Sequence, residues 1–447
     1  MMDMTEGRPL RHLVKYAVPL LLGNLMQLMY NAVDSIIAGR FIGEAALAAE
    51  GIAEPIMNMI ILLISGITIG SGVLMSEAYG AKDMDRVRKL NATTLILGLI
   101  AGSIVGLLGF FLSRYILILM DTPSSILDKT TWYLSITFLG VPFVFVFNAL
   151  SAGLKSVGDS KTPLLFLAFS SILNAVLDLI FLGLLGFGII CSATTTVVAE
   201  IVSAFLALWW TGTRNKEIFP RSRDLRIKKD SVLSIVKYGG PTALQQMVQP
   251  LGKLFIQGAV NSLGVASIAA FNAAARVDSF ALIPEQGIAA AEATYIAQNR
   301  GAGKKERVMK GFWSGVVLEL SYALFIGVVV FFLKDGIVSL FIDGESAKTV
   351  IERGASYLGV MAFLYGLPSM TNLVQGFFRG NGKMYTTIVG TTVQITVRTI
   401  FTFILTPKLG IIGIAYASGL GWAMMLAWEI PYLFITAHKR GYKIRGM

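Results

Sequence analysis

Ionisable side chains are scarce in this sequence, and cysteine is nearly absent. Charged residues make up only 15% of the 447 positions, and the chain has two histidines and one cysteine, Cys191. A single cysteine excludes a disulfide within the chain. Hydrophobic residues make up 55% of the sequence, which is more apolar side chain than a soluble domain buries in its core. The composition therefore excludes an ordinary soluble protein and indicates an integral membrane protein.

Long apolar stretches recur along the whole chain. We count twelve of them between residues 14 and 436, each near the roughly 20 residues that a helix needs to cross about 30 Å of hydrocarbon. The start of the chain lacks the short apolar region and small-residue cleavage site of a removable signal, so the first span is expected to stay in the protein. The sequence thus predicts an all-α integral membrane protein with twelve transmembrane helices.

The formal net charge of +11 could suggest a nucleic-acid partner, but the basic residues are distributed differently. With the N-terminus inside, 28 of the 38 Lys and Arg residues fall in inner segments, 8 in outer segments and 2 within spans. This is the positive-inside pattern, so we expect a multi-pass protein of the cell inner (plasma) membrane with both termini cytoplasmic. Nucleic acid is not an expected partner, because no basic domain with interleaved aromatics lies outside the spans.

The two halves of the chain resemble each other. Residues 66–89 align with residues 287–310 without a gap, and Gly80 matches Gly301. An even number of spans separates the copies, so both halves have the same orientation in the membrane. We expect two six-helix lobes related by a pseudo-twofold axis along the membrane normal, as in transporters that alternate access by rocking two lobes.

The longest inner loop sets the predicted domain boundaries. Residues 1–210 form an N-lobe with spans 1 to 6, residues 211–234 form a cytoplasmic linker loop, and residues 235–447 form a C-lobe with spans 7 to 12.

A stripe of polar residues interrupts the first span. Asn24, Gln27, Asn31 and Asp34 are spaced three or four residues apart, so they lie on one face of a helix. The stripe ends in a carboxylate, which lipid would not tolerate facing outward. This face is expected to meet other polar groups inside the N-lobe.

Spans 5 and 6 carry the candidate partners of this stripe: Asn174 and Asp178, and the threonines 194–196. At about 1.5 Å rise per residue, Asp34, Asp178 and Thr196 all lie roughly 9 to 10 Å below the outer ends of their spans. Hard oxygen ligands at one depth suit a monovalent cation or a shared proton. The alternative is that these groups only hydrogen-bond the helices together.

The C-terminal half does not repeat this acidic arrangement. Asn174 and Asp178 align with Arg398 and Thr402, and span 7 carries Lys253. Span 8 carries three carboxylates seven residues apart, nearly on one helical face: Asp278, Glu285 and Glu292. They could line a cavity and attract cationic substrate, or neutralise the two basic residues. We favour ion pairs, because unpaired cations inside a bilayer are costly.

Several segments in order resemble the multidrug and toxic-compound extrusion (MATE) family of the MOP flippase superfamily, in its prokaryotic form. They are residues 19–56, the YGAK and RGAGK loops after spans 2 and 8, and residues 153–163. The resemblance implies a V-shaped pair of six-helix lobes that exports mainly organic cations, driven by inward movement of Na⁺ or H⁺.

The resemblance also implies a cation site in the N-lobe. Some family members have a first-span Asp, an Asn and an Asp one turn apart in the fifth span, and a Thr in the sixth. Asp34, Asn174, Asp178 and Thr196 match those positions here. Other members use acidic residues in spans 7 and 10, and this sequence has none there.

The expected function is therefore a secondary active multidrug efflux antiporter, not an enzyme. It would export organic cations or amphiphilic drugs in exchange for H⁺ or Na⁺ by alternating access. We expect a monomer in membrane lipid, with no cofactor and no metal beyond Na⁺ at the four matched residues. The sequence does not choose between the two ions. The alternatives are a lipid-linked oligosaccharide flippase of the same superfamily and a non-transporting scaffold or receptor. ATP-driven transport is not expected, since no Walker A loop is present.

Overall fold

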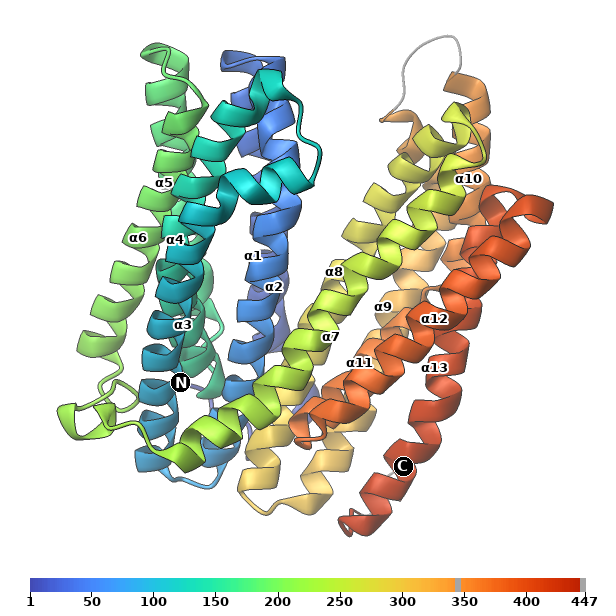
Figure 1. Cartoon of the computed structure of the whole chain (residues 1–447). Helices are drawn as coiled ribbons and strands as arrows, with labels where there is room; N and C mark the ends of the chain where they lie inside the picture. The colour runs from blue at the N-terminus through green and yellow to red at the C-terminus, as the bar shows by residue number, and fades with distance from the viewer. Residues whose placement is uncertain (342–346, 443–447) are drawn as a thin grey trace. The chain divides into compact units, whose positions relative to one another are not determined.

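The computed structural model describes residues 1–341 and 347–442, and within these ranges the chain is built from helices joined by short loops (Figure 1). The helices of the first half are α1 (Pro9–Phe41), α2 (Glu44–Gly80), α3 (Met84–Leu119), α4 (Ser124–Ser156), α5 (Lys161–Asp178), the π-helix η1 (Leu179–Leu184), α6 (Ile189–Arg214) and the 3₁₀-helix η2 (Ser222–Leu225). Those of the second half are α7 (Lys229–Asn261), α8 (Val265–Gly301), α9 (Lys305–Ser339), α10 (Ala347–Leu364), α11 (Gly366–Gly380), α12 (Met384–Leu409) and α13 (Ile411–Lys439).

The helices account for the twelve predicted spans. Over the part of the chain that the structure describes, nine helices are long and apolar enough to cross a membrane, and α10 and α11 form one further span bent by 48°. The two remaining long helices, α1 and α7, open the two halves and carry the polar stripe and Lys253 within them. This confirms the predicted all-α membrane fold.

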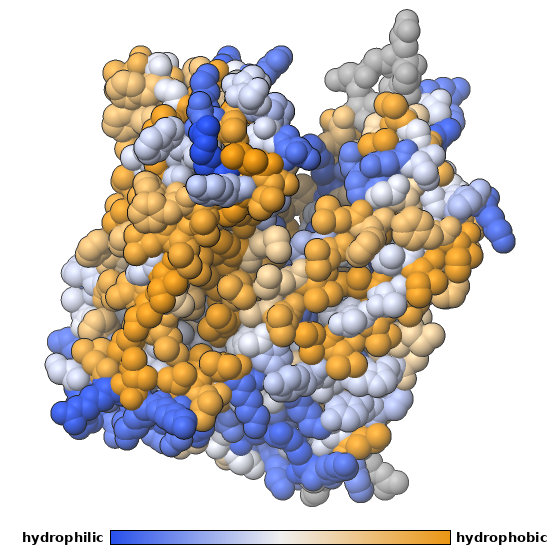
Figure 2. Space-filling view, in the orientation of Figure 1, coloured by the Kyte–Doolittle hydropathy of each residue, from blue (hydrophilic) through white to orange (hydrophobic). Residues whose placement is uncertain are grey.

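The surface agrees with a lipid environment. Large apolar side chains such as Phe111, Leu324 and Phe332 are 70% or more exposed. Figure 2 shows apolar residues over the middle of the helices and hydrophilic residues gathered near helix ends. A surface with this much exposed apolar side chain is favourable in contact with lipid acyl chains and unfavourable in contact with water.

The chain divides into two compact units. Unit 1 comprises Met1–Asp3 and Leu22–Ala243, and unit 2 comprises Met4–Leu21 and Leu244–Met447. Each boundary falls inside a helix, because the first part of α1 packs in unit 2 and the first part of α7 packs in unit 1. The lobe boundaries named above were drawn at loops and stay a prediction of the sequence.

Glycines of α2 allow α7 to pack closely against α2 in unit 1. A Cβ on Gly66 of α2 would lie 2.2 Å from the Ala243 Cα, and one on Gly70 would lie 2.4 Å from the Gly239 nitrogen. Only glycine permits this backbone approach. In unit 2, Gly287 of α8, the repeat equivalent of Gly66, faces the first part of α1, where a Cβ would lie 3.4 Å from the Ala17 carbonyl oxygen. The two contacts are repeat-related, but the second is looser.

Within unit 1, α4 packs against α2, α3 and α6, while α5 packs chiefly on α6. Within unit 2, α8 packs against α9, α10 and α11, and α12 pairs with α13. These arrangements put α5 beside α6 in unit 1, and α8 beside α9 in unit 2, which is where the buried polar side chains of each unit gather.

Candidate functional site

Asp178 stands where the α-helix α5 ends and the π-helix η1 begins. Short π-helical segments widen a turn and are often found at functional sites. The Asp178 side chain is fully buried, and its Oδ1 accepts a short hydrogen bond from the hydroxyl of Thr195 on α6. Its other oxygen, Oδ2, has no hydrogen-bond partner among the described residues. Thr195 thus holds this buried carboxylate through Oδ1.

Asp34 of α1 meets Asp178 in unit 1. The two carboxyl groups lie within hydrogen-bonding reach of each other, and Asp34 Oδ1 has no donor among the residues that the structure describes. Two carboxylates cannot both be ionised at this separation without a strong repulsion. The pair therefore requires a proton or a cation between its oxygens.

Asn174 and Thr196 complete the group of four residues that the resemblance singled out. Asn174 is 1% exposed, its side chain also interacts with Asp178, and its Nδ2 donates to Thr196 Oγ1 at 3.4 Å. The phenol of Tyr30 on α1 hydrogen-bonds Thr196 as well. The four residues thus lie together, and Thr195, the neighbour of Thr196, is the threonine that contacts Asp178.

Glu50 of α2 is a member of this cluster that sequence reasoning missed. It is 7% exposed, and Ser192 Oγ of α6 donates to its Oε1 at 3.4 Å. Its negative charge acts on Asp34, and that of Asp178 acts on Glu50. The apolar stretch of the second span begins near residue 52 in the sequence, which leaves Glu50 outside it, whereas the helix α2 begins at Glu44.

The remaining stripe residues of α1 lie apart from the carboxylate pair. Asn24, Gln27 and Asn31 are exposed in the structure, and Gln27 Nε2 donates to Asn31 Oδ1 at 3.3 Å. No hydrogen bond given for the described residues joins them to Asp34 or Asp178. They form a polar face that leads along α1 toward the buried site.

The donor set of unit 1 defines what could bind there. Two carboxylates, a hydroxyl and an amide oxygen, Asn174 Oδ1, which has no partner in the described chain, are all oxygen ligands. The described residues bring together no group of three or more Asp, Glu, His or Cys side chains suited to a metal ion. Ligands of this kind suit a proton or a hard cation.

In unit 2 the three span-8 carboxylates are separate from one another. Asp278 accepts hydrogen bonds from the hydroxyls of Tyr357 at 3.0 Å and Tyr365 at 2.7 Å. Glu285 accepts from Ser369 Oγ at 2.6 Å and Asn372 Nδ2 at 3.4 Å. Uncharged hydrogen-bond donors therefore contact Asp278 and Glu285, where we expected the basic residues Lys253 and Arg398.

The expected ion pairs with Lys253 and Arg398 are not formed in the described part of the chain. The charge of Arg398 acts on Asp278, but no ion pair joins them and Arg398 Nε has no hydrogen-bond partner among the described residues. The positive charge of Arg398 also acts on Lys253, so the two basic residues repel each other. The physical reason is that hydroxyl and amide donors from α10, from α11 and from Tyr365 between these helices already satisfy Asp278 and Glu285.

Glu292 and Glu319, like Glu429 of α13, are buried acids of unit 2 whose carboxylate oxygens have no hydrogen-bond partner among the described residues. Glu319 lies on α9, within range of the charges of Glu285 and Glu292. Sequence reasoning missed Glu319, although an isolated carboxylate in the middle of an apolar span was signal enough.

Apolar helices long enough to cross a membrane, in two compact units with buried carboxylates, define this protein as a polytopic membrane protein. The sequence profile of the MatE family matches residues 19–180 and 241–404, which is more than half of the chain and falls in both halves. The chain therefore belongs to the MATE family of transporters, and it is a transporter rather than an enzyme.

Proteins of similar sequence carry the names of transporters or multidrug resistance proteins. The chain is 31% identical over 421 residues to the probable multidrug resistance protein YpnP of Bacillus subtilis, covering 94% of this chain and 93% of that one. It is 24% identical to the probable multidrug resistance protein NorM of Thermotoga maritima, covering 90% and 87%. It is 22% identical to the FAD transporter of Shewanella oneidensis, covering 80% and 79%.

Solved structures share the fold. An outward-facing multidrug resistance MATE family transporter of the MOP superfamily superimposes with a TM-score of 0.92 at 21% identity, covering 98% of each chain. A MOP superfamily transporter from Pyrococcus furiosus, described as having a binding pocket of reverse polarity, superimposes with a TM-score of 0.90 at 20% identity, covering 99% and 98%. These likenesses show the fold of twelve membrane-spanning helices.

Proposed function

We propose that this chain is a secondary active multidrug efflux antiporter, which exports organic cations and amphiphilic drugs in exchange for H⁺ or Na⁺ by alternating access. It would act as a monomer in the cell inner membrane, with both termini in the cytoplasm. Membership of the MATE family and the multidrug resistance names of its relatives support the export of drugs. The positive-inside count supports the orientation.

The observation that carries the ion coupling is the Asp34–Asp178 pair. Carboxylates are rare inside membrane spans, and here the half-buried Asp34 and the fully buried Asp178 meet from different helices. When a proton or Na⁺ binds, α1 and α5 can stay together at this point. When it leaves, the like charges repel, and the two helices are pushed apart or attract another cation.

This change gives a route for coupling. Asp34 lies on the same helix as the exposed polar face of Asn24, Gln27 and Asn31, so a movement of α1 at the site would also move that face. The ion and a cationic substrate would compete for the same negative charge. By thermodynamic linkage, each would lower the affinity for the other.

The test is transport by the full-length protein reconstituted in lipid vesicles. Ethidium movement would be followed under an imposed Na⁺ gradient and, separately, an imposed pH gradient. Asp34→Asn should abolish gradient-driven movement, while Asp128→Asn, which removes a surface carboxylate paired with Arg114, should leave it intact. Unchanged coupled movement in a folded Asp34→Asn protein would sink the coupling proposal, and the gradient that drives the wild type would identify the ion.

The two basic residues of unit 2 keep a second candidate open. Lys253 and Arg398 lie within spans without an acidic ion-pair partner among the described residues, so they could attract an anionic amphiphile such as a lipid-linked oligosaccharide. A vesicle assay with such a lipid would test this. Loss of its movement in Lys253→Gln and Arg398→Gln, with ethidium export unchanged in the same variants, would favour the flippase.

A further inference from the structure

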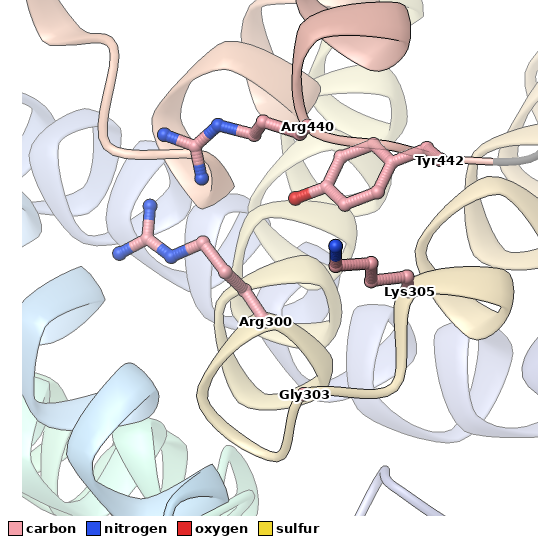
Figure 3. Close-up of a pocket in the computed structure, with 5 residues that line it drawn as sticks. All are labelled: Arg300, Gly303, Lys305, Arg440 and Tyr442. Atoms are coloured by element: carbon pink, nitrogen blue, oxygen red, sulfur yellow. The ribbon is translucent and has the colours of Figure 1, made fainter.

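A cavity at the ends of α8 and α13 in unit 2 is lined mainly by cations. Its lining residues are Arg300, Gly303, Lys305, Arg440 and Tyr442 (Figure 3). Three of these five are positively charged, and no carboxylate is among them. The cavity volume is about 170 Å³, which is more than one water molecule fills. A group of several atoms can therefore enter.

The walls of this cavity are held by backbone turns and by Asn381. Asn381, which caps α11 and is fully buried, accepts a hydrogen bond from the Tyr442 hydroxyl at 2.7 Å on Oδ1. Its carbonyl oxygen accepts from Arg440 at 2.9 Å. Figure 3 shows the guanidinium groups of Arg300 and Arg440 and the amine of Lys305 turned toward the same space. The three charges are thus positioned by the fold.

Neighbouring cations of the same loop have structural roles that Lys305 lacks. Lys304 donates to the Thr5 carbonyl at 3.0 Å, and Arg307 donates to Asn299 and to the carbonyls of two residues in the N-terminal segment. These bonds tie the start of the chain to unit 2. Lys305 makes no side-chain hydrogen bond or ion pair given for the described residues, and its side chain is exposed at the cavity.

The internal repeat shows that the loop does not need these charges in order to fold. Gly303 corresponds to Lys82 of unit 1, and both have a positive φ, 70° and 62°. The two turns therefore share one conformation. Yet Arg300 corresponds to Tyr79, and Lys305 to Met84. Cations at the positions of Arg300 and Lys305 are therefore specific to unit 2, in a turn that forms without them in unit 1.

We propose that this cavity binds the phosphate group of an anionic ligand. Arginine guanidinium groups offer paired donors that match phosphate oxygens, and a lysine adds a point charge. The positive-inside count places this end of α8 and α13 on the cytoplasmic side, where the leaflet is anionic. The phosphate can come from a lipid headgroup such as phosphatidylglycerol or from a soluble phosphate, and basic pockets between helices on this side commonly take headgroups.

Native mass spectrometry of the full-length protein in detergent tests the proposal. The protein would be titrated with phosphatidylglycerol, with phosphatidylcholine as the zwitterionic comparison, and with inorganic phosphate in a separate arm. The wild type should bind phosphatidylglycerol or phosphate selectively, and Lys305→Gln should weaken that binding about tenfold, as loss of one charge-assisted hydrogen bond does. Lys310→Gln removes the same charge from an exposed position outside the cavity and should have no effect.

The two arms identify the source of the phosphate. Loss confined to phosphatidylglycerol supports a lipid headgroup, and loss confined to inorganic phosphate supports a soluble ligand. Arg440→Gln should act in the same direction, but Arg440 also holds Asn381, so thermal unfolding of each variant is measured alongside. An equal loss in Lys310→Gln, or unchanged binding in a folded Lys305→Gln protein, would overturn the proposal. None of these outcomes depends on the drug-export proposal.

Discussion

Units 1 and 2 descend from one repeated design, but they place their buried charges differently. Unit 1 brings Asp34 and Asp178 together from two helices, with Thr195 as the donor to Asp178. In unit 2, the position equivalent to Asp178 is Thr402, and the buried acids are spread over α8, α9 and α13. A repeated backbone therefore preserves the bundle while its polar chemistry diverges. We infer that ion coupling is a task of unit 1.

The largest effect should come from the carboxylate pair. Asp178→Asn removes one of the two charges that require a proton or cation, so gradient-driven export should fall by about 5- to 150-fold, the range of an allosteric coupling energy of 1 to 3 kcal/mol. Asp278→Asn in unit 2 should have a much smaller effect, because that acid is satisfied by two tyrosines. Export in vesicles measures both, and equal losses would remove the distinction between the units.

The next largest effect should come from the glycine contacts between repeat-related helices. Gly66→Ala forces a Cβ into the backbone of Ala243, so it should destabilise unit 1 by about 1 to 3 kcal/mol. Gly287→Ala, at the equivalent position of unit 2, meets only an ordinary contact and should be tolerated. Thermal unfolding in detergent compares the two, and equal unfolding temperatures would show that the two contacts are equally tight.

An effect of similar size, on ion binding instead of folding, should follow from removing the hydroxyl that contacts Asp178. Thr195→Ala deletes a hydrogen bond to a charged group, worth about 1.5 to 3 kcal/mol, and so should shift the ion concentration that gives half-maximal export by roughly tenfold or more. Thr195→Ser keeps the hydroxyl and should restore the wild-type value. The ion titration of export is the measurement, and failure of serine to rescue would point to a packing role.

The smallest effect is expected on the exposed face of α1. Asn31→Ala removes one long hydrogen bond with Gln27 at the surface, so folding stability should change by less than about 0.5 kcal/mol. Ion dependence should stay as in the wild type, because this side chain lies outside the carboxylate pair. Unfolding and the same ion titration test this, and a shift in ion dependence as large as that of Thr195→Ala would place Asn31 in the site.

Much of the fold was readable from the sequence because the membrane imposes simple constraints. A spanning helix needs about 20 apolar residues, and a charged side chain within it is conspicuous. This identified the helices, the repeat, Asp34 and Asp178. It failed for Glu50, because the glutamates near the start of α2 lower the local hydropathy there, and for Glu319, which was read as part of an apolar span.

The sequence by itself determined the membrane class, the twelve spans, the internal repeat and the family. These properties follow from the amino-acid composition, the lengths of the apolar stretches and the matches between the two halves. None of them requires knowing which helices are in contact. Only the tertiary structure decided the partners: that Thr195 holds Asp178, that tyrosines hold Asp278 where basic residues were expected, and that α1 and α7 each pack in both units. These contacts depend on how closely the helix backbones approach and on which donor then lies within hydrogen-bonding distance of each carboxylate. Neither can be read from the local sequence.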